Sequence, residues 1–323
     1  MYIPLVFNYQ LNFGGIFVKK DLLKMDNLSK EEILDILNLA DQLKYEQKHG
    51  IEHHILKGKT LGMIFEKAST RTRVSFEVGM YQLGGNALFL SDKDLQIGRG
   101  EPIEDTARVL SRFMQGIMIR TFSQQEAETL AKYSSIPIIN GLTDEEHPCQ
   151  VLADLMTIRE NKNILEGLKV AYIGDGNNMA KSLMIGCLKV GMNFSIASPE
   201  KYTVSQDYLN RGKEIAEKEN VEFIITTSPA EAVKDADVVI TDAWVSMGHE
   251  DESEEKVPYF EGFQVNSELL KCANNDVMVL HCLPCKRNEE ITPEVLEAHA
   301  DEIFDESENR LHAQKAVLVK LMK

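Results

Sequence analysis

The chain has 323 residues, more than one hydrophobic core usually organises, so two domains are expected. Its composition of 43% hydrophobic and 27% charged residues, with 20 Gly and 9 Pro, is typical of a globular protein and excludes collagen-like, low-complexity and disordered chains. The formal net charge of -16 argues against a protein that coats nucleic acid, because such a protein needs a basic surface.

The first element in chain order is a helix that begins after Ser29. The sequence Ser29-Lys30-Glu31-Glu32 is a capping box, apolar residues follow at helical spacing, and Gly50 marks the helix end. Short apolar runs then alternate with helical patterns. Nine of these runs are predicted strands: 60–66, 86–91, 116–122, 136–141, 169–176, 193–198, 221–228, 237–244 and 276–284. Strands separated by helices predict an α/β fold of parallel sheets with crossover connections.

The domain division is predicted near residue 155, because a helical stretch there precedes Gly167 and the next strand. We expect a first domain over 1–155, with 1–17 as an extension, and a second domain over 156–307, each a parallel sheet flanked by helices. Between Glu250 and Arg310 there are 17 Asp or Glu against five Lys or Arg. The acidic half would suit a cationic ligand, although the run 250–255 is also typical of a solvated loop.

Parallel sheets bind ligands at the carboxyl ends of their strands, so the residues that follow each strand were compared. The early strands end in cationic or proton-donating groups: Lys67 to Arg73, Arg120 and His147. The later strands end in an amide, a carboxylate and a thiol: Asn178, Asp242 and Cys282. Two chemically different halves of a substrate pair are indicated.

The segment Ser69-Thr70-Arg71-Thr72-Arg73 opens a helix. A helix N-terminus offers unpaired N–H groups and partial positive charge, and hydroxyls and guanidinium groups add donors, so the segment is suited to an oxyanion such as phosphate. The alternative is a capped helix with solvent-exposed arginines. Arg120 and His147 at neighbouring strand ends disfavour this alternative.

Three other motifs leave alternatives open. Residues Gly174 to Met179 are half of a dinucleotide fingerprint without its third glycine, so a tight turn that presents Asn178 to a small substrate fits as well. Cys282-Leu283-Pro284-Cys285 is a Cys-x-x-Cys, but a redox or zinc site would require a context that is missing. Asp242 either caps a turn or pairs with an ammonium group.

With these residues together, the chain resembles the aspartate/ornithine carbamoyltransferase family, continuously from about Val18 to the C-terminus. The resemblance is carried by six segments in the right order: Ser69 to Arg73, Asp105 to Arg108, His147 to Gln150, Asp242 to Gly248, His281 to Pro284 and Glu308 to Arg310. The Ser246-Met247-Gly248 segment is similar to the branch that acts on ornithine.

The resemblance implies a carbamoyl-phosphate domain, an ornithine domain and a last helix, 308–323, that packs back on the first domain. The implied contacts to carbamoyl phosphate are Ser69, Thr70, Arg71, Thr72, Gln96, Arg120, His147, Gln150, Cys282, Leu283 and Arg310. The implied contacts to ornithine are Asn178, Asp242, Ser246 and Met247. Gln96 matches a loop that reaches into the neighbouring subunit in this family, which implies a homotrimer or a multiple of trimers.

The implied reaction transfers the carbamoyl group of carbamoyl phosphate to the δ-amine of L-ornithine, giving L-citrulline and phosphate, in arginine biosynthesis or in arginine deiminase catabolism. The implied catalytic residues are Arg120 and His147 at the carbamoyl oxygen, where the oxyanion develops, and Asp242 and Cys282 at the amine. No metal or redox cofactor is expected, since no electrons move and the donor is already activated.

Lys286 and Arg287 lie after the His281 to Pro284 segment, at positions where the family varies. Because of these two residues, an amine other than ornithine stays open as the acceptor. The alternatives are a transferase of the same family that acts on putrescine or N-acetylornithine, and a non-catalytic anion-binding regulatory relative. The presence of Ser246-Met247-Gly248 favours ornithine, and the joint presence of the catalytic residues disfavours the regulatory relative.

A cytoplasmic location is predicted. Five cysteines are too few and too scattered for a disulfide scaffold of this size, so a reducing compartment is expected. No run approaches the roughly 18 apolar residues of a membrane span. The predicted partners are therefore small molecules and other copies of the chain, without nucleic acid or membrane.

Overall fold

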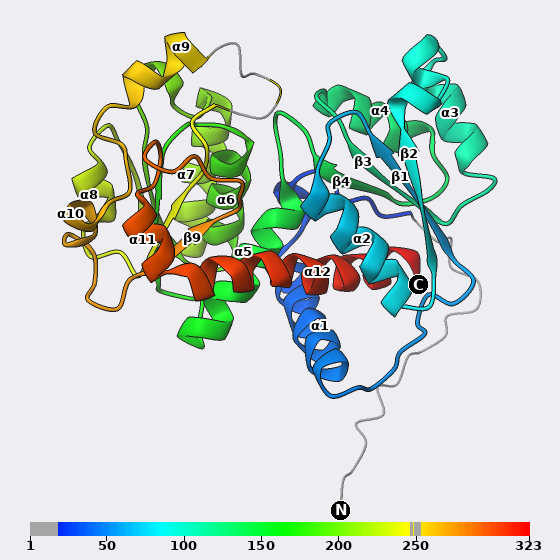
Figure 1. Cartoon of the computed structure of the whole chain (residues 1–323), viewed down its shortest axis with the longest axis horizontal. Coiled ribbons are helices and arrows are strands. Elements are labelled where there is room, and N and C mark those ends of the chain that lie inside the picture. The colour runs from blue at the N-terminus through cyan, green and yellow to red at the C-terminus, as the bar shows by residue number, and fades with distance from the viewer. Residues whose placement is uncertain (1–18, 246–247, 249–252) are drawn as a thin grey trace, which may run out of the picture.

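The computed structural model describes residues 19–245, 248 and 253–323. They form two parallel sheets, each flanked by helices, with α12 (Ala300–Met322) running across both (Figure 1). The predicted α/β class with two parallel sheets is confirmed, and so are the nine predicted strands. The predicted extension over 1–17 lies outside the described residues.

The first sheet has the strand order β2-β1-β3-β4. Its strands are β1 (Thr60–Phe65), β2 (Asn86–Ser91), β3 (Gly116–Arg120) and β4 (Ile138–Leu142). The helices of this half are α1 (Lys30–Lys48), α2 (Thr70–Gln82), α3 (Ile103–Leu110), α4 (Gln124–Tyr133) and α5 (Pro148–Lys162). The chain passes from β1 outward to β2 and then returns to β3 on the other side, so the strand order reverses between β1 and β3.

The second sheet has the order β7-β6-β5-β8-β9. Its strands are β5 (Lys169–Ile173), β6 (Asn193–Ala197), β7 (Phe223–Thr226), β8 (Val238–Thr241) and β9 (Met278–His281). Its helices are α6 (Asn178–Lys189), α7 (Gln206–Glu219), α8 (Pro229–Val233), α9 (Ser253–Lys256), α10 (Ser267–Leu270) and α11 (Pro293–Ala298). Here the order reverses between β5 and β8. Such reversal points open crevices at the strand ends, where parallel sheets bind ligands.

The helices begin and end at the local signals that the sequence analysis identified. The Ser29 hydroxyl accepts from the Glu32 backbone N–H, and the Glu32 carboxylate accepts from the Ser29 N–H at 3.0 Å, so the predicted capping box is formed. The Ser69 hydroxyl caps α2 by accepting from the Thr72 N–H. Gly50 and Gly84 follow their helices with φ of 68° and 77°, a conformation that favours glycine.

The acidic run over 250–255 is only partly a loop. Ser253 to Glu255 open the short helix α9, whereas 250–252 lie outside the described residues. Glu254 and Glu255 are exposed, as expected for a solvated segment. The helix is held from its other end, where the buried Lys256 ammonium binds the Asp175 carboxylate at 2.7 Å.

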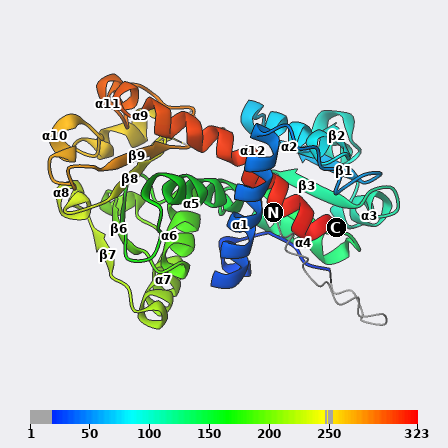
Figure 2. The ribbon, with the colours of Figure 1, turned by 90° about the horizontal axis from the view of Figure 1, so that it is seen from below.

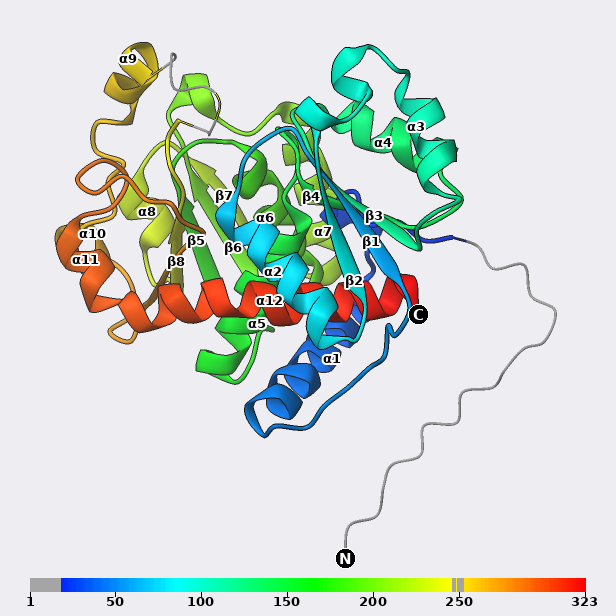
Figure 3. The same cartoon turned by 45° about the vertical axis from the view of Figure 1, so that its right-hand side comes forward.

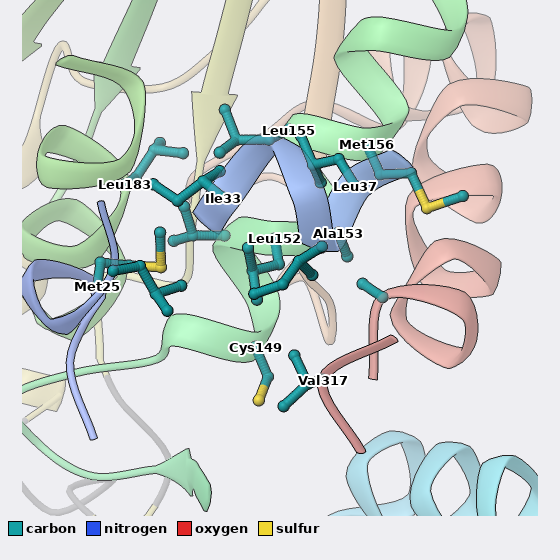
Figure 4. Close-up of a cluster of buried hydrophobic side chains, with 14 of the residues drawn as sticks. Met25, Ile33, Leu37, Cys149, Leu152, Ala153, Leu155, Met156, Leu183 and Val317 are labelled. Carbon is teal, nitrogen blue, oxygen red and sulfur yellow. The ribbon is translucent and has the colours of Figure 1, made fainter. Parts of the chain in front are cut away.

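The helix α5 lies in the middle of the largest hydrophobic cluster. Its side chains pack against α1, α6 and α12, as Figure 4 shows for Leu152 and Leu155 beside Ile33, Leu183 and their neighbours. Almost every residue of α5 from Pro148 to Ile158 is buried. Each buried leucine of this kind contributes about 1.5–3 kcal/mol through burial, so this helix fixes the position of one half against the other.

The last helix, α12, contacts elements of both halves. It packs against β9 and α11 at its start and against α1, α2 and α5 further along (Figures 2 and 3). Residue 155 lies within α5, and we retain the domain division near it as a proposal. No helix among the described residues is long and apolar enough to cross a membrane.

One buried histidine of α12 gives a prediction on acid stability. Burial lowers the pKa of His312 to about 4, although a hydrogen bond to Glu308 opposes the shift. Below the unfolded pKa of 6.5, the unfolded chain takes up this proton more readily than the folded one, so stability is lost as pH falls from 6.5 toward 4. We expect His312→Gln to reduce the loss in unfolding free energy between pH 7 and pH 5 by about 1–2 kcal/mol.

The measurement is urea unfolding of both proteins at the two pH values. His54→Gln is the matched control, because the His54 side chain is 61% exposed and should leave the difference unchanged. An unaltered pH difference in His312→Gln would show that this histidine is not held neutral by burial.

Candidate active site

A cavity of about 310 Å³ lies at the carboxyl ends of both sheets. Its walls come from the turns after β1, β3, β5, β8 and β9, from the start of α5 and from α12. It gathers nine of the predicted site residues: Ser69, Arg71, Arg120, His147, Asn178, Asp242, Cys282, Leu283 and Arg310. The strand-end comparison therefore identified one continuous site, assembled from segments up to 241 residues apart in the chain.

One side of the cavity is a basic wall, which we define as Arg71, Arg120, His147 and Arg310. Arg120 and Arg310 are 4% and 3% exposed. Burial and the neighbouring guanidinium groups lower the pKa of Arg120 to about 9 and that of Arg310 as well. Buried cations held this closely are costly, so the wall favours an anionic ligand.

The hydrogen-bonding state of the basic wall supports this conclusion. The Nε atoms of Arg71, Arg120 and Arg310 and the Nδ1 of His147 are buried and have no hydrogen-bond partner among the described residues. Buried donors are rarely left unpaired in folded proteins. Three guanidinium groups with spare donors around one cavity are suited to a phosphate or another oxyanion.

Thr72 stands behind the basic wall and does not line the cavity. It is fully buried, and its hydroxyl oxygen accepts from Arg310 Nη2 at 2.8 Å and from Arg120 Nη1 at 3.4 Å. Thr72 therefore aligns two arginines from β3 and α12. Thr70 is exposed at the first turn of α2 and does not line the cavity either.

Two described residues among the predicted contacts, Gln96 and Gln150, are not brought into the cavity of this chain. Gln96 is exposed in the loop between β2 and α3. Gln150 is fully buried one turn into α5, behind the cavity. The predicted ornithine contacts Ser246 and Met247 lie outside the described residues. These four residues remain predictions.

The opposite side of the cavity carries the carboxylate of Asp242, at the end of β8. Asn177 Nδ2 donates to one of its oxygens at 2.8 Å, and the Cys282 thiol donates to the other at 3.1 Å. Burial, together with the negative charge of Asp242, raises the pKa of Cys282 well above its usual range, so the thiol keeps its proton. Asp242 thus lines the same cavity as the basic wall, with both carboxylate oxygens oriented by hydrogen bonds.

Asn178 lies beside this group at the start of α6. Its side-chain amide donates to the Thr143 backbone carbonyl at 2.6 Å, and the residue lines the cavity. One amide hydrogen is therefore already used, and the second remains for a ligand. At this start of α6, the Asn177 side chain accepts from the Met179 and Ala180 backbone N–H groups.

The predicted substrate contacts did not include two residues that the structure places at the site, Lys67 and Asn177. Lys67 lines the cavity, forms an ion pair with Asp144 and lies over the Phe122 ring at 4.1 Å. Asn177 both caps α6 and orients Asp242. The signal for both was their position directly after a strand, which they share with the predicted residues.

The segment that carries Cys282 and Leu283 is shaped by a buried hydrogen-bond network. The His281 Nδ1 accepts from the Leu283 N–H at 2.9 Å, and its Nε2 lies 3.0 Å from the Glu290 carboxylate. Both His281 and Glu290 are fully buried, and the Leu283–Pro284 peptide bond is cis. The network fixes the turn that presents Leu283 to the cavity.

Three side chains at the site could in principle ligate a metal. One ligand atom each of Asp242, His281 and Cys282 lie within 4.8 Å of one another, the single such group among the described residues. Both ring nitrogens of His281 have protein partners, and Cys282 is a protonated thiol that donates to Asp242. The group is thus engaged in positioning Asp242 and Leu283.

A second and larger cavity, of about 760 Å³, lies between residues 47–57 and 81–86 and reaches Lys315. It contains none of the predicted site residues. Size alone therefore does not identify the site, whereas the chemistry of the smaller cavity does.

Two parallel sheets with a basic wall and a carboxylate facing each other across one cavity define a two-domain α/β protein that binds an anion. The family model described as aspartate/ornithine carbamoyltransferase, carbamoyl-P binding domain, matches residues 20–160. The model of the Asp/Orn binding domain of the same family matches residues 166–321. The chain belongs to the aspartate/ornithine carbamoyltransferase family, as its motifs predicted.

Individual relatives agree with this assignment. A protein of Carboxydothermus hydrogenoformans named ornithine carbamoyltransferase is 55% identical over 303 residues, which are 94% of this chain and 97% of the relative. The solved structure of ornithine carbamoyltransferase from Pyrococcus furiosus is 50% identical, with a TM-score of 0.90 over 94% of this chain and 97% of that one. The anabolic ornithine carbamoyltransferase of Campylobacter jejuni is 45% identical, with a TM-score of 0.89 over 94% and 98%.

Proposed function

We propose that the chain transfers the carbamoyl group of carbamoyl phosphate to the δ-amine of L-ornithine, giving L-citrulline and phosphate. The observation that carries this proposal is the set of unpaired buried donors on the basic wall, opposite the oriented carboxylate of Asp242. An anionic donor and a cationic acceptor would each meet the side of the cavity with the opposite charge. The names of the relatives support the same pair of substrates.

The donor half of the reaction requires charge stabilisation. Phosphate is the leaving group, so negative charge grows on its oxygens as the C–O bond breaks, and Arg71 and Arg310 are placed to neutralise it. We assign Arg120 and His147 as the hydrogen-bond donors to the carbamoyl oxygen. Burial and the nearby arginines lower the pKa of His147 well below 6.5, so the imidazole is neutral and donates a hydrogen bond without giving up a proton.

The acceptor half requires a neutral amine. The δ-ammonium of ornithine has an ordinary pKa of about 10.4 and carries a proton at neutral pH. Asp242 would first bind this ammonium group by charge and then orient the amine toward the carbamoyl carbon, with the Cys282 thiol holding the carboxylate in place. Two groups can take the proton in the reactive complex, Asp242 and the departing phosphate.

We further propose that the protein is a trimer or a multiple of trimers. The resemblance assigns Gln96 to the neighbouring subunit's site, and Gln96 is exposed here. Large apolar side chains are exposed on the adjacent α2 and β2: Val74, Tyr81, Leu88 and Phe89, with Tyr81 at 81%. Exposed apolar groups next to an edge strand favour a protein contact. Light scattering of the purified protein measures the assembly directly.

The proposed reaction belongs to arginine metabolism, and we place it in the cytoplasm. Cys149, Cys187, Cys272, Cys282 and Cys285 are all free thiols. This state supports a reducing compartment.

A further prediction concerns the acceptor. Purified protein, assayed for carbamoylated product with ornithine, putrescine, N-acetylornithine and aspartate in parallel, is expected to use ornithine at least tenfold better than any other amine. The physical reason is that Asp242 and the start of α6 provide one anionic and one amide-rich end for an α-amino acid with a cationic side chain. The colorimetric assay of citrulline measures the rate.

Faster turnover of putrescine or N-acetylornithine than of ornithine would contradict the prediction and identify that amine as the acceptor. Binding of carbamoyl phosphate by calorimetry without turnover of any amine would instead support a non-catalytic anion-binding role. Addition of a metal chelator serves as a control and is expected to leave the rate unchanged.

A further inference from the structure

A buried carboxylate lies directly before His147 of the basic wall. Glu146 is in the loop 143–147 between β4 and α5, and the residue is 0% exposed. Burial raises the pKa of Glu146, and hydrogen bonds from three donors oppose this shift. A buried carboxylate needs such donors, so its partners show which parts of the protein it holds together.

The three donors come from outside the loop. Ser182 Oγ on α6 donates to Glu146 Oε2 at 2.6 Å, and Tyr208 Oη on α7 donates to Oε1 at 2.8 Å. The Met25 backbone N–H donates to Oε2 at 3.3 Å. Glu146 follows the last strand of the first sheet, whereas α6 and α7 belong to the second sheet. The carboxylate therefore links the two halves of the protein.

Ser182 also contacts the backbone of His147. The His147 N–H donates to Ser182 Oγ at 2.8 Å, so the same oxygen accepts one hydrogen bond and donates another. A hydroxyl group has a single hydrogen. Because Glu146 accepts that hydrogen, the lone pairs of Ser182 Oγ stay available to the His147 N–H. Glu146 thus orients the hydroxyl group that holds His147.

The position of the His147 imidazole depends on its backbone. His147 lines the cavity, and its Nδ1 is buried without a hydrogen-bond partner among the described residues. The residue is the N-cap of α5, but its side chain makes no capping hydrogen bond. No hydrogen bond at Nδ1 therefore fixes the ring, and its place follows from the backbone and from packing.

The other end of the loop is held against the same helix. Asn178 Nδ2, one turn before Ser182 on α6, donates to the Thr143 carbonyl at 2.6 Å. Within the loop, the Thr143 N–H donates to the Glu146 carbonyl at 2.9 Å, and the Glu146 N–H donates to Thr143 Oγ1 at 3.1 Å. Residues four apart lie on one face of a helix. The start of α6 and the loop therefore form one connected unit.

We propose that Glu146 and Ser182 are positioning residues for His147, which fix its backbone across the boundary between the two halves so that the imidazole donates to the carbamoyl oxygen. This proposal rests on the proposed function, since it needs a carbamoyl oxygen at His147. Neither Glu146 nor Ser182 lines the cavity, so both act through His147. The effect is expected in kcat, because a hydrogen bond to a developing oxyanion strengthens in the transition state.

The test compares Ser182→Ala with Tyr208→Phe in the full-length protein. Each substitution removes one hydroxyl group that donates to Glu146, but only Ser182 also holds His147. Ser182→Ala is expected to lower kcat about 10- to 100-fold, because a catalytic group misplaced by about 1 Å loses up to two powers of ten in rate. Tyr208→Phe is expected to keep kcat within about threefold, and both variants should keep the KM for carbamoyl phosphate within about threefold.

Substitutions of Glu146 test the orientation of the hydroxyl group. Ser182 Oγ and the Met25 N–H both donate to Oε2, so a glutamine with its carbonyl oxygen at that position keeps both hydrogen bonds. Glu146→Gln is therefore expected to keep kcat within about threefold, and Glu146→Leu to lower it at least about tenfold. Glu145→Leu is the matched control: Glu145 also binds α6, through Lys181 at 3.0 Å, but its side chain is 48% exposed. This control should change kcat by less than about twofold.

A double substitution separates positioning from general damage. In a His147→Ala background the imidazole is absent, so Ser182→Ala is expected to lower kcat by less than about a further twofold. Damage to the fold would instead lower kcat by the same factor in both backgrounds.

Three results would overturn the inference: an unchanged kcat in Ser182→Ala, an equal loss of kcat in Tyr208→Phe, or full additivity with His147→Ala. If Ser182→Ala does not fold, Ser182→Cys replaces it, because a thiol keeps the shape but is a weak donor and acceptor, and kcat is then expected to fall at least about fivefold. A wild-type protein that binds carbamoyl phosphate in calorimetry but carbamoylates no amine would instead refute the proposed function.

Discussion

Arg71→Ala is expected to weaken carbamoyl phosphate binding by at least about 100-fold, to the limit of calorimetric detection. Arg71 lines the cavity, its Nε is buried without a partner, and it stands in the first turn of α2, where the helix N-terminus also favours an anion. A hydrogen bond to a charged group contributes about 1.5–3 kcal/mol, and a bidentate guanidinium–phosphate pair has two. Removal of both therefore costs two or more powers of ten.

The matched control for this experiment is Arg112→Ala. Arg112 is exposed after α3 and does not line the cavity, so the substitution removes the same charge from the same half of the protein without touching the site. Affinity that survives in Arg71→Ala, or falls equally in Arg112→Ala, would contradict the phosphate role. Circular dichroism checks that both variants are folded.

Asp242→Asn is expected to lower kcat by about 10²- to 10⁴-fold, the usual contribution of a positioned acid or base. Asparagine has nearly the same shape but cannot neutralise the ornithine ammonium or accept its proton. It also has one acceptor oxygen, whereas both Asn177 Nδ2 and the Cys282 thiol donate to this position in the wild type. Carbamoyl phosphate affinity should stay within about threefold, because the basic wall is unchanged.

Steady-state kinetics with both substrates, together with calorimetry of carbamoyl phosphate, measures these two quantities separately. Asp276→Asn is the control, since Asp276 is 80% exposed and pairs with Lys162 away from the cavity. An unchanged kcat in Asp242→Asn would contradict the role of Asp242 at the amine. A loss of carbamoyl phosphate affinity as large as the loss of kcat would contradict it too.

Basic and acidic side chains are separated along the chain, and both kinds line one cavity. The basic wall collects guanidinium groups from α2, β3 and α12 and the His147 imidazole from the start of α5, and Asp242 and Cys282 line the same cavity just after β8 and β9. Arg310 lies at the end of the acidic segment in the sequence but belongs to the basic wall in the structure. Its last helix crosses to the first half and brings its guanidinium group to Thr72 at 2.8 Å.

The sequence by itself determined the elements and most of the cavity. Strand and helix periodicities, the capping box at Ser29, the N-cap at Ser69 and the residues after each strand are local signals, and each lies within a few neighbouring positions. Parallel strands then bring their carboxyl ends to one edge of each sheet, so Arg120 and His147 were expected to lie together, and so were Asp242 and Cys282, without knowledge of the sheet order. The packing of the two halves brings these two edges to one cavity.

Only the tertiary structure decided which polar groups are buried and what they bind. Asp154 stands in the apolar run of α5, and its partner Glu306 is 152 positions later, so no local pattern connects them. The same holds for Thr72, whose hydroxyl group aligns two arginines from distant elements. Burial raises the pKa of both carboxyl groups, because packing removes water from them, and packing is set by contacts between helices that the local sequence does not encode.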